Sequence, residues 1–163
     1  MALIVETGLG LSNANSYVSA ADAQAYHSDR GNALWTDGDD DAKLAALIRA
    51  TSALDGIYGR RWPGYRCGTY QALAWPRYEA WDADAWPLVD VPAKIMASCC
   101  EAALVELVTP GALSVALERG GMLVSKTTGP LSMTWAANAP GGTTYPRIHQ
   151  PLESIIQGRR ASR

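Results

Sequence analysis

Mostly apolar residues between positions 44 and 54 recur at the period of an α-helix. They lie at i, i+3, i+4, i+7 and i+10: Leu44, Leu47, Ile48, Thr51 and Leu54. This spacing places them on one face of a helix that packs against a core. The acidic run that ends at Asp41 supplies an N-cap, and Asp55-Gly56 ends the helix.

A broader apolar face predicts a second long helix after Pro92, a residue suited to a first helical turn. Its members are Ile95, Met96, Cys99, Cys100, Ala103, Leu104, Leu107 and Val108. Thr109-Pro110-Gly111 terminates this helix. Two shorter helices are also predicted, an Ala-rich one from its N-cap Ser19 to Gly31 and another over 112–118.

Residues 122–127 and 131–135 predict the two strands of a small hairpin around Thr128-Gly129-Pro130. Together with the helices, they predict a mainly α fold: a small helical bundle with a short β-hairpin near the C-terminus and an extended C-terminal arm.

The chain is expected to divide into a body and an arm. The helical body spans residues 1–137, including the hairpin at 122–135. The arm spans residues 138–163, because the sequence from Asn138 is rich in Pro and Gly. From Arg147 onward it carries four Arg and one Glu, so the arm is basic.

Residues 57–86 show no sustained period and predict a long connection packed against the body. At most a helical turn is expected at 71–74, since Pro76 blocks continuation. Within this connection, residues 58–78 contain four Arg, six Tyr or Trp and no acid.

This Arg- and aromatic-rich block has two interpretations. Rings can stack on unpaired bases while Arg contacts phosphates, which is how single-stranded nucleic acid is held without sequence readout. The residues expected to make such contacts are Arg60, Arg61, Trp62, Tyr65 and Arg66. Alternatively, Trp62, Trp75 and their neighbours anchor the connection to the helices, with Arg stacked on them.

The composition of the chain limits the classes of function that it can have. The 163 residues are 48% hydrophobic and 18% charged with a net charge of −2, which indicates one domain with a real core. These values exclude a strongly basic nucleic-acid binder and a disordered chain. No apolar run is long enough for a membrane span, and no secretory signal is expected.

The aromatic composition is unusual. The chain contains no Phe, but 6 Trp and 7 Tyr, whose polar N–H and O–H groups suit interfaces as well as cores.

Charge is unevenly distributed. Residues 1–41 hold seven acids and one base, whereas the rest of the chain has more bases than acids. This asymmetry is compatible with head-to-tail contacts between copies, although a solvated acidic face explains it more simply.

Little in the sequence indicates catalysis. The two His and three Cys are scattered, so we expect no metal site and no cofactor. A hydrolase built on Cys67 or His27 has no local signature, and we expect no enzyme activity. Residues 7–12 lack the ending of a phosphate loop and predict a flexible entry loop. The acids at 37–41 lack the spacing of a calcium loop.

Several stretches, in order, resemble one group of tailed-bacteriophage proteins. They are residues 5–19 (VETGLGLSNANSYVS), 47–51 (LIRAT), 71–77 (QALAWPR), 91–95 (VPAKI) and 120–135 (GGMLVSKTTGPLSMTW). Proteins of this group are often labelled DnaT-like single-stranded DNA-binding proteins, and the group resembles the head-to-tail connector (adaptor) proteins of long-tailed phages. The similarity covers roughly residues 4–156.

The resemblance implies a structural virion protein: an adaptor subunit in a ring expected to hold twelve copies, between the portal and the next neck or tail component. Its implied partners are the portal protein, a neck/stopper or tail protein, other copies of itself, and double-stranded DNA that passes through the lumen without sequence specificity. No membrane partner is implied. The implied location is the virion neck, and the host cytoplasm during assembly.

The resemblance also implies that the C-terminal segment docks into the portal. Its residues would be Arg147, Ile148, Leu152, Ile155, Ile156, Arg159 and Arg160. The alternative function is single-stranded DNA binding of the DnaT-like kind, through the block at 58–78.

Overall fold

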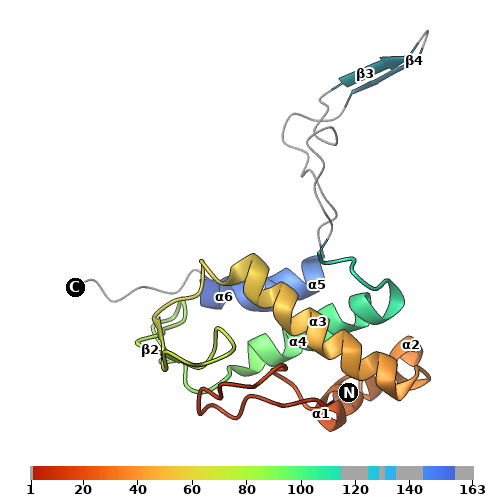
Figure 1. The fold of residues 1–163 in the computed structure, drawn as a ribbon. Coiled ribbons are helices and arrows are strands. Elements are labelled where there is room, and N and C mark those ends of the chain that lie inside the picture. Colours follow the sequence, from red (N-terminus) through yellow and green to blue (C-terminus); the bar gives the residue numbers. More distant parts are fainter. Residues whose placement is uncertain (1, 115–124, 129–130, 135–144, 157–163) are drawn as a thin grey trace.

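Two long helices, α3 (Asp40–Tyr58) and α4 (Ala93–Val108), pack against each other at the centre of the fold (Figure 1). The computed structural model describes residues 2–114, 125–128, 131–134 and 145–156. Both helices were expected from the apolar spacing, and the mainly α class with a small hairpin is confirmed. No helix in these ranges is long and apolar enough to cross a bilayer.

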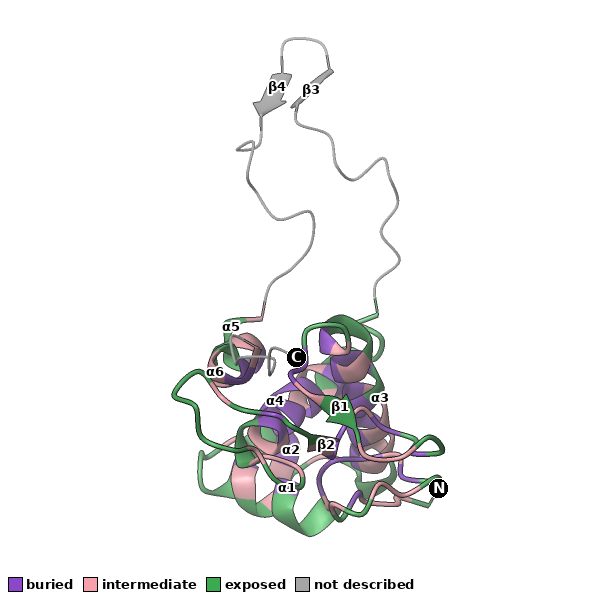
Figure 2. Cartoon of the chain, turned by 90° about the vertical axis from the view of Figure 1, so that its left-hand side faces the viewer, coloured by how far each residue is buried: buried purple, intermediate pink, exposed green. Residues whose placement is uncertain are grey.

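Small side chains form much of the contact between the two helices. The buried small residues are Ala46, Ala50, Ala53, Cys99, Ala102 and Ala103. Small side chains let two helix backbones approach closely, and Thr51 Oγ1 lies 3.3 Å from Cys99 Sγ, within hydrogen-bonding distance. Leu47, Thr51 and Leu54 are buried as expected, whereas Leu44 and Ile48 are only half-buried. The buried side of each long helix faces the interior of the fold (Figure 2).

The shorter elements surround this pair. The predicted first helix is α1 (Ala20–Ser28), and its N-cap Ser19 accepts a hydrogen bond from the Asp22 backbone N–H as expected. A one-turn helix, α2 (Ala33–Thr36), follows it and was not expected. Residues 112–114 form a turn rather than the start of the predicted helix at 112–118, and residues 115–118 lie outside the described ranges.

Two antiparallel ribbons complete the structure. Strands β3 (Ser125–Thr128) and β4 (Leu131–Thr134) pair in register, Ser125 with Thr134 and Thr128 with Leu131, which confirms the predicted hairpin. Strands β1 (Tyr65–Arg66) and β2 (Arg77–Tyr78) form a second, shorter ribbon inside the long connection, where none was expected.

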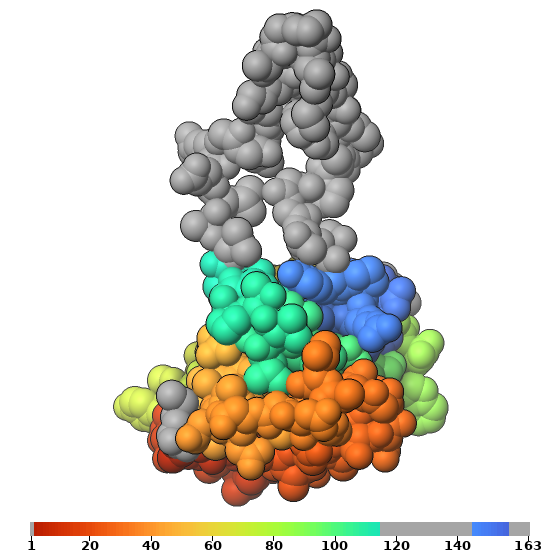
Figure 3. Space-filling view, turned by 90° about the vertical axis from the view of Figure 1, so that its right-hand side faces the viewer, coloured from red at the N-terminus to blue at the C-terminus, as the bar shows by residue number. Residues whose placement is uncertain are grey.

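The C-terminal segment differs from the expected extended arm. Residues 146–156 form α5 (Pro146–His149), the 3₁₀ helix η2 (Gln150–Leu152) and α6 (Glu153–Ile156) (Figure 3). They lie along α4, and Ser154 of α6 accepts a hydrogen bond from Lys94 in the first turn of that helix at 2.7 Å. The side chains of Ile148, Leu152 and Ile155 are buried in the core. Their spacing of four and three residues is that of a helix, so the apolar pattern of this segment already favoured helix over an extended chain.

A buried carboxylate ties the end of α4 to its neighbours. Glu106 is 1% exposed and accepts hydrogen bonds from the backbone N–H groups of Gly111 and Leu113, at 2.7 and 2.9 Å. Arg49 of α3 donates to the same carboxylate at 2.9 Å and to the Glu106 carbonyl at 3.0 Å. Burial by itself would raise the pKa of Glu106, but these donors outweigh it and hold the pKa below its ordinary value.

Acid should therefore weaken the fold through Glu106. Because its pKa is lower in the folded than in the unfolded protein, its stabilisation is present above the ordinary value of about 4.5 and is lost as pH falls through the folded-state value. We expect Glu106→Gln to unfold at lower urea concentration at pH 7, by about 1–3 kcal/mol, and to lose less further stability than wild type on acidification. The control Asp84→Asn, at an exposed carboxylate outside the helices, should leave the urea midpoint at pH 7 unchanged. Parallel profiles for wild type and Glu106→Gln would contradict this assignment.

Candidate nucleic-acid interface

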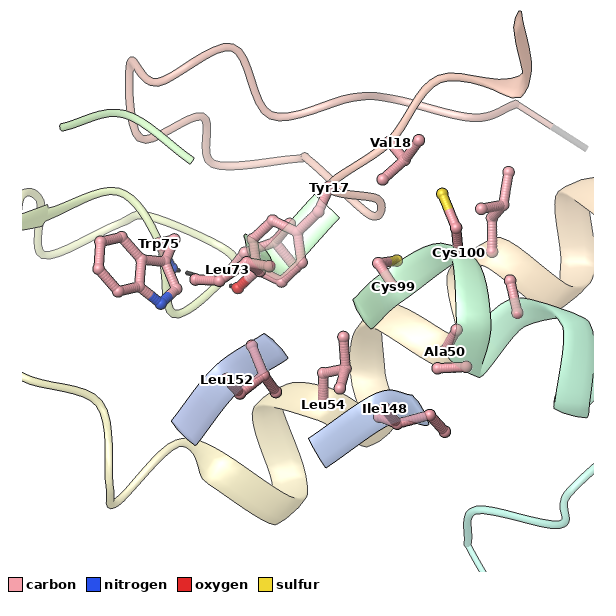
Figure 4. Packing of buried hydrophobic residues seen from close by; sticks show 14 of the residues in the cluster. Tyr17, Val18, Ala50, Leu54, Leu73, Trp75, Cys99, Cys100, Ile148 and Leu152 are labelled. Atoms are coloured by element: carbon pink, nitrogen blue, oxygen red, sulfur yellow. Dashed lines mark hydrogen bonds between the residues drawn. The ribbon is translucent and has the colours of Figure 1, made fainter. Parts of the chain in front are cut away.

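The connection between α3 and α4 is held to the body by a buried hydrogen-bond network. Tyr17 is 1% exposed and donates its hydroxyl to Asp55 Oδ1 at 2.6 Å. Asp55 Oδ2 accepts the Ala74 backbone N–H at 2.8 Å, and the Tyr17 oxygen accepts that of Trp75 at 3.2 Å (Figure 4). Burial raises the pKa of Tyr17, and the neighbouring Asp55 raises it further, so the phenol stays protonated and donates.

Two further side chains fix the backbone of the connection. Gln71 accepts the N–H groups of Cys67 and Gly68 at 3.1 and 3.2 Å, and donates to the carbonyls of Leu73 and Pro76 at 2.9 and 3.0 Å. A second set of contacts comes from the Arg77 guanidinium, which donates to the carbonyls of Pro63, Gly64 and Ala74. The loop is therefore ordered without long regular structure.

The indoles of the connection face inward. Trp62 and Trp75 are both 0% exposed, with ring centroids 6.0 Å apart and an edge-on interplanar angle of 78°. This is the anchoring role that one interpretation of the block predicted for both residues. It corrects the other interpretation for Trp62, because a fully buried ring cannot stack on a base.

The tyrosines of the connection face outward. In the β1–β2 ribbon Tyr65 pairs directly with Tyr78, so both side chains lie on one face of it, and they are 46% and 65% exposed. Three further aromatic side chains of the connection are exposed: Tyr70, Trp81 and Trp86. Tyr70 and Tyr78 belong to the block at 58–78 that the sequence indicated, whereas Trp81 and Trp86 lie beyond it and were not among the expected contacts.

Arginine side chains accompany these rings. Arg60, Arg61 and Arg66 are exposed, as nucleic-acid contact requires, and the Arg61 guanidinium carbon lies 5.6 Å from the Tyr58 ring centroid. Tyr65 and these three Arg, four of the five predicted contacts, are therefore all exposed within residues 60–66. We call the exposed set Arg60, Arg61, Tyr65, Arg66 and Tyr78 the Tyr–Arg surface; within it Tyr65 and Tyr78 share one face of the ribbon, and Arg66 starts from the other.

A hollow of about 410 Å³ adjoins this surface. Its lining includes Tyr78 and Trp81 of the connection and Gly8 and Leu9 of the N-terminal loop. That loop is not the flexible entry expected from its glycines. The buried Glu6 carboxylate accepts the N–H groups of Gly8, Gly10 and Leu11 at 2.9–3.0 Å and fixes the turn.

The residues considered for catalysis have structural contacts. His27 is 0% exposed, and its Nε2 lies 3.1 Å from the Cys100 carbonyl while its Nδ1 lies 2.9 Å from the Asn32 amide. Burial lowers the pKa of His27, so the neutral ring donates to Cys100 and accepts from Asn32. Burial raises the pKa of the Cys67 thiol, which makes it a weaker nucleophile. Within the described ranges, no group of His, Cys, Asp and Glu could hold a metal ion.

The residues expected to dock into a portal are divided in the structure. Arg147 is exposed on α5, whereas Ile148, Leu152 and Ile155 are buried and Ile156 is half-buried. Arg159 and Arg160 lie outside the described ranges. In this conformation the apolar members of the set serve the chain's own core.

Comparison with known proteins gives one match. The model of the family described as "Putative DnaT-like ssDNA binding protein" matches residues 1–163. No curated protein and no solved structure matches the chain.

Removing the Tyr17 hydroxyl should release the connection. Tyr17→Phe leaves an Asp55 oxygen and the Trp75 N–H without their partner, and we expect a loss of about 1–3 kcal/mol in the free energy of unfolding. The matched control is Tyr26→Phe, whose hydroxyl donates to Glu101 at 3.0 Å from a less buried position. Urea unfolding of both variants measures the difference, and an equal or larger loss in Tyr26→Phe would contradict the central role given to Tyr17.

Proposed function

The chain belongs to this DnaT-like family, and on that basis we propose that it binds single-stranded DNA through the Tyr–Arg surface. The observation that carries the proposal is the pairing of exposed Tyr65 and Tyr78 on one face of a ribbon. The next residue of the same strand is the exposed Arg66, whose side chain starts from the other face of this two-residue ribbon. Rings of this kind stack on bases of any sequence, and guanidinium groups contact the phosphates between them.

The fixed backbone supports this function. A surface that is ordered before binding loses less conformational entropy when a strand is bound. Gln71 and Arg77 hold the ribbon and the loop between its strands through seven hydrogen bonds to main-chain groups. The protein would act as a binding protein, without a reaction of its own.

The net charge of the chain sets an expectation for affinity. An overall acidic protein attracts DNA weakly, so binding should depend on the local group of Arg60, Arg61 and Arg66 and fall steeply with salt. Stacking on tyrosines should supply the part of the affinity that survives at higher salt.

Anisotropy of a labelled single-stranded oligonucleotide tests the proposal. We expect Tyr78→Ala to weaken binding about tenfold and Tyr78→Phe to retain it, because phenylalanine still stacks. Arg66→Gln should weaken binding and reduce the salt dependence, whereas the matched control Arg147→Gln, an exposed arginine on α5, should do neither. The proposal would be overturned if wild type did not bind the oligonucleotide, or if Arg147→Gln weakened binding as much as Arg66→Gln.

A second candidate function, the ring-forming adaptor of a phage neck, is favoured by the placement of charge. The exposed acids Asp39, Asp40 and Asp41 stand at the start of α3, and Arg60 and Arg61 follow its end. Nineteen helical residues separate the two groups by about 28 Å. Opposite charges at opposite ends of a subunit suit head-to-tail contacts, which close into rings when the rotation permits.

Exposed apolar side chains are consistent with such contacts. Leu34 of α2 is 69% exposed near the acidic end, and Trp86 and Val89 are each 70% exposed in the connection. In this role the protein would occupy the virion neck after assembly in the host cytoplasm, with the portal and a neck or tail protein as neighbours and double-stranded DNA passing through the ring.

Mixing the protein with a purified portal and imaging the product by electron microscopy tests this second candidate. A ring on the portal is expected, and a chain ending at Ile156 that lacks Arg159 and Arg160 should dock less well, as should Arg147→Gln. This truncation keeps the buried Ile148, Leu152 and Ile155 in place. A protein that stays monomeric beside the portal would contradict the adaptor role.

A further inference from the structure

We propose that the hollow beside the Tyr–Arg surface receives one unpaired base that carries an exocyclic amino group, such as cytosine or adenine, in preference to thymine. The inference rests on the DNA-binding function proposed above and adds a base preference to it. The hollow, of about 410 Å³, falls within the range of pockets that hold small organic ligands.

The walls of the hollow offer flat apolar surfaces to solvent. Tyr78 is 65% and Trp81 is 39% exposed, and Leu9, which also lines the hollow, is 80% exposed. A base that leaves the stacked strand loses contact with its neighbours, and stacking on aromatic side chains restores that contact. Tyr78 belongs both to the Tyr–Arg surface and to the lining of the hollow, so the two adjoin at this residue.

The polar groups of the hollow include two exposed carboxylates. Glu79 and Asp90 both line it, and neither has a hydrogen bond or ion pair with another described residue. Both residues have positive φ, 51° and 53°. The third charged residue of the lining, Arg77, directs its guanidinium N–H groups to main-chain carbonyls.

Carboxylates at this position select among ligands. They repel a phosphate, so the strand's backbone should follow Arg60, Arg61 and Arg66 on β1 and the loop before it. They accept hydrogen bonds from the amino groups of cytosine N4 and adenine N6, whereas thymine has a carbonyl oxygen and a methyl group at the corresponding edge. An oxygen facing a carboxylate is unfavourable, which disfavours thymine.

The N-terminal loop lies close to one of the two carboxylates. A Cβ on Gly8 would lie 2.6 Å from Asp90 Oδ1, so only glycine fits beside this side chain, and Gly8 also has a φ of +90°. The turn that brings Gly8 here depends on Glu6, whose carboxylate accepts the Gly8 N–H at 3.0 Å. The part of the hollow that the N-terminal loop lines is therefore shaped by an internally hydrogen-bonded turn.

Anisotropy titrations with labelled oligo(dC), oligo(dA) and oligo(dT) of equal length test the preference. Wild type should bind oligo(dC) and oligo(dA) about fivefold more tightly than oligo(dT). In the double variant Glu79→Gln/Asp90→Asn this ratio should fall to about one, with oligo(dT) binding unchanged or tighter because negative charge has been removed. The single variant Trp81→Ala should weaken binding of all three.

The control is Asp41→Asn, which removes one exposed acid at the far end of α3 and should leave the ratio unchanged. The base preference would be overturned by equal affinities for the three oligonucleotides, or by a preference over oligo(dT) that persists in the double variant. In either case, salt-dependent binding would still support the proposed function. If none of the three oligonucleotides binds, both proposals fail.

Discussion

The Asp55 carboxylate is the point on which the arrangement of the connection depends. It sits near the end of α3 and joins three segments far apart in sequence: the N-terminal segment through Tyr17, its own helix, and the connection through the Ala74 N–H. Burial raises the pKa of Asp55 even though its hydrogen bonds act to lower it. Asp55 is half-buried, and a carboxylate withdrawn from water in this way is costly to leave without its hydrogen-bond partners. Moving the connection away from α3 would break these hydrogen bonds, which favours the observed position.

The aromatic composition follows from this arrangement. Trp62 and Trp75 fill the space between the connection and the helices, whereas Tyr65 and Tyr78 stand on the opposite side of the same segment. Phenylalanine could fill the core, but a tyrosine hydroxyl also tolerates water, which favours Tyr at exposed positions. Of the two sequence-based interpretations of the block, anchoring is therefore confirmed for the indoles, and nucleic-acid contact remains a proposal for the tyrosines and arginines.

The sequence predicted the regular elements well and the irregular ones poorly. The 3.6-residue spacing identified α3 and α4, Ser19 identified the start of α1, and the turn at 128–130 identified the β3–β4 hairpin. The sequence pattern could not reveal β1 and β2, because strands of two residues are too short to show an alternating period. Their pairing also depends on hydrogen bonds from Gln71 and Arg77 to main-chain groups that only the folded structure brings within reach. The spacing of Ile148, Leu152 and Ile155 did carry a helical signal, which the surrounding Pro and Gly obscured. For the candidate site, residue types indicated which side chains have chemistry suited to DNA. Only the structure shows that Trp62 is buried and that Tyr65 is exposed.

The central claim is that an anchored connection presents a surface for single-stranded DNA. Hydrogen–deuterium exchange with and without oligo(dC) tests it most directly, since it reports on every backbone segment at once. The account predicts slower exchange on binding in residues 60–70 and 77–90, with α1 and α2 unchanged. Protection confined to α1, α2 or α5, or no protection at saturating oligonucleotide, would contradict it.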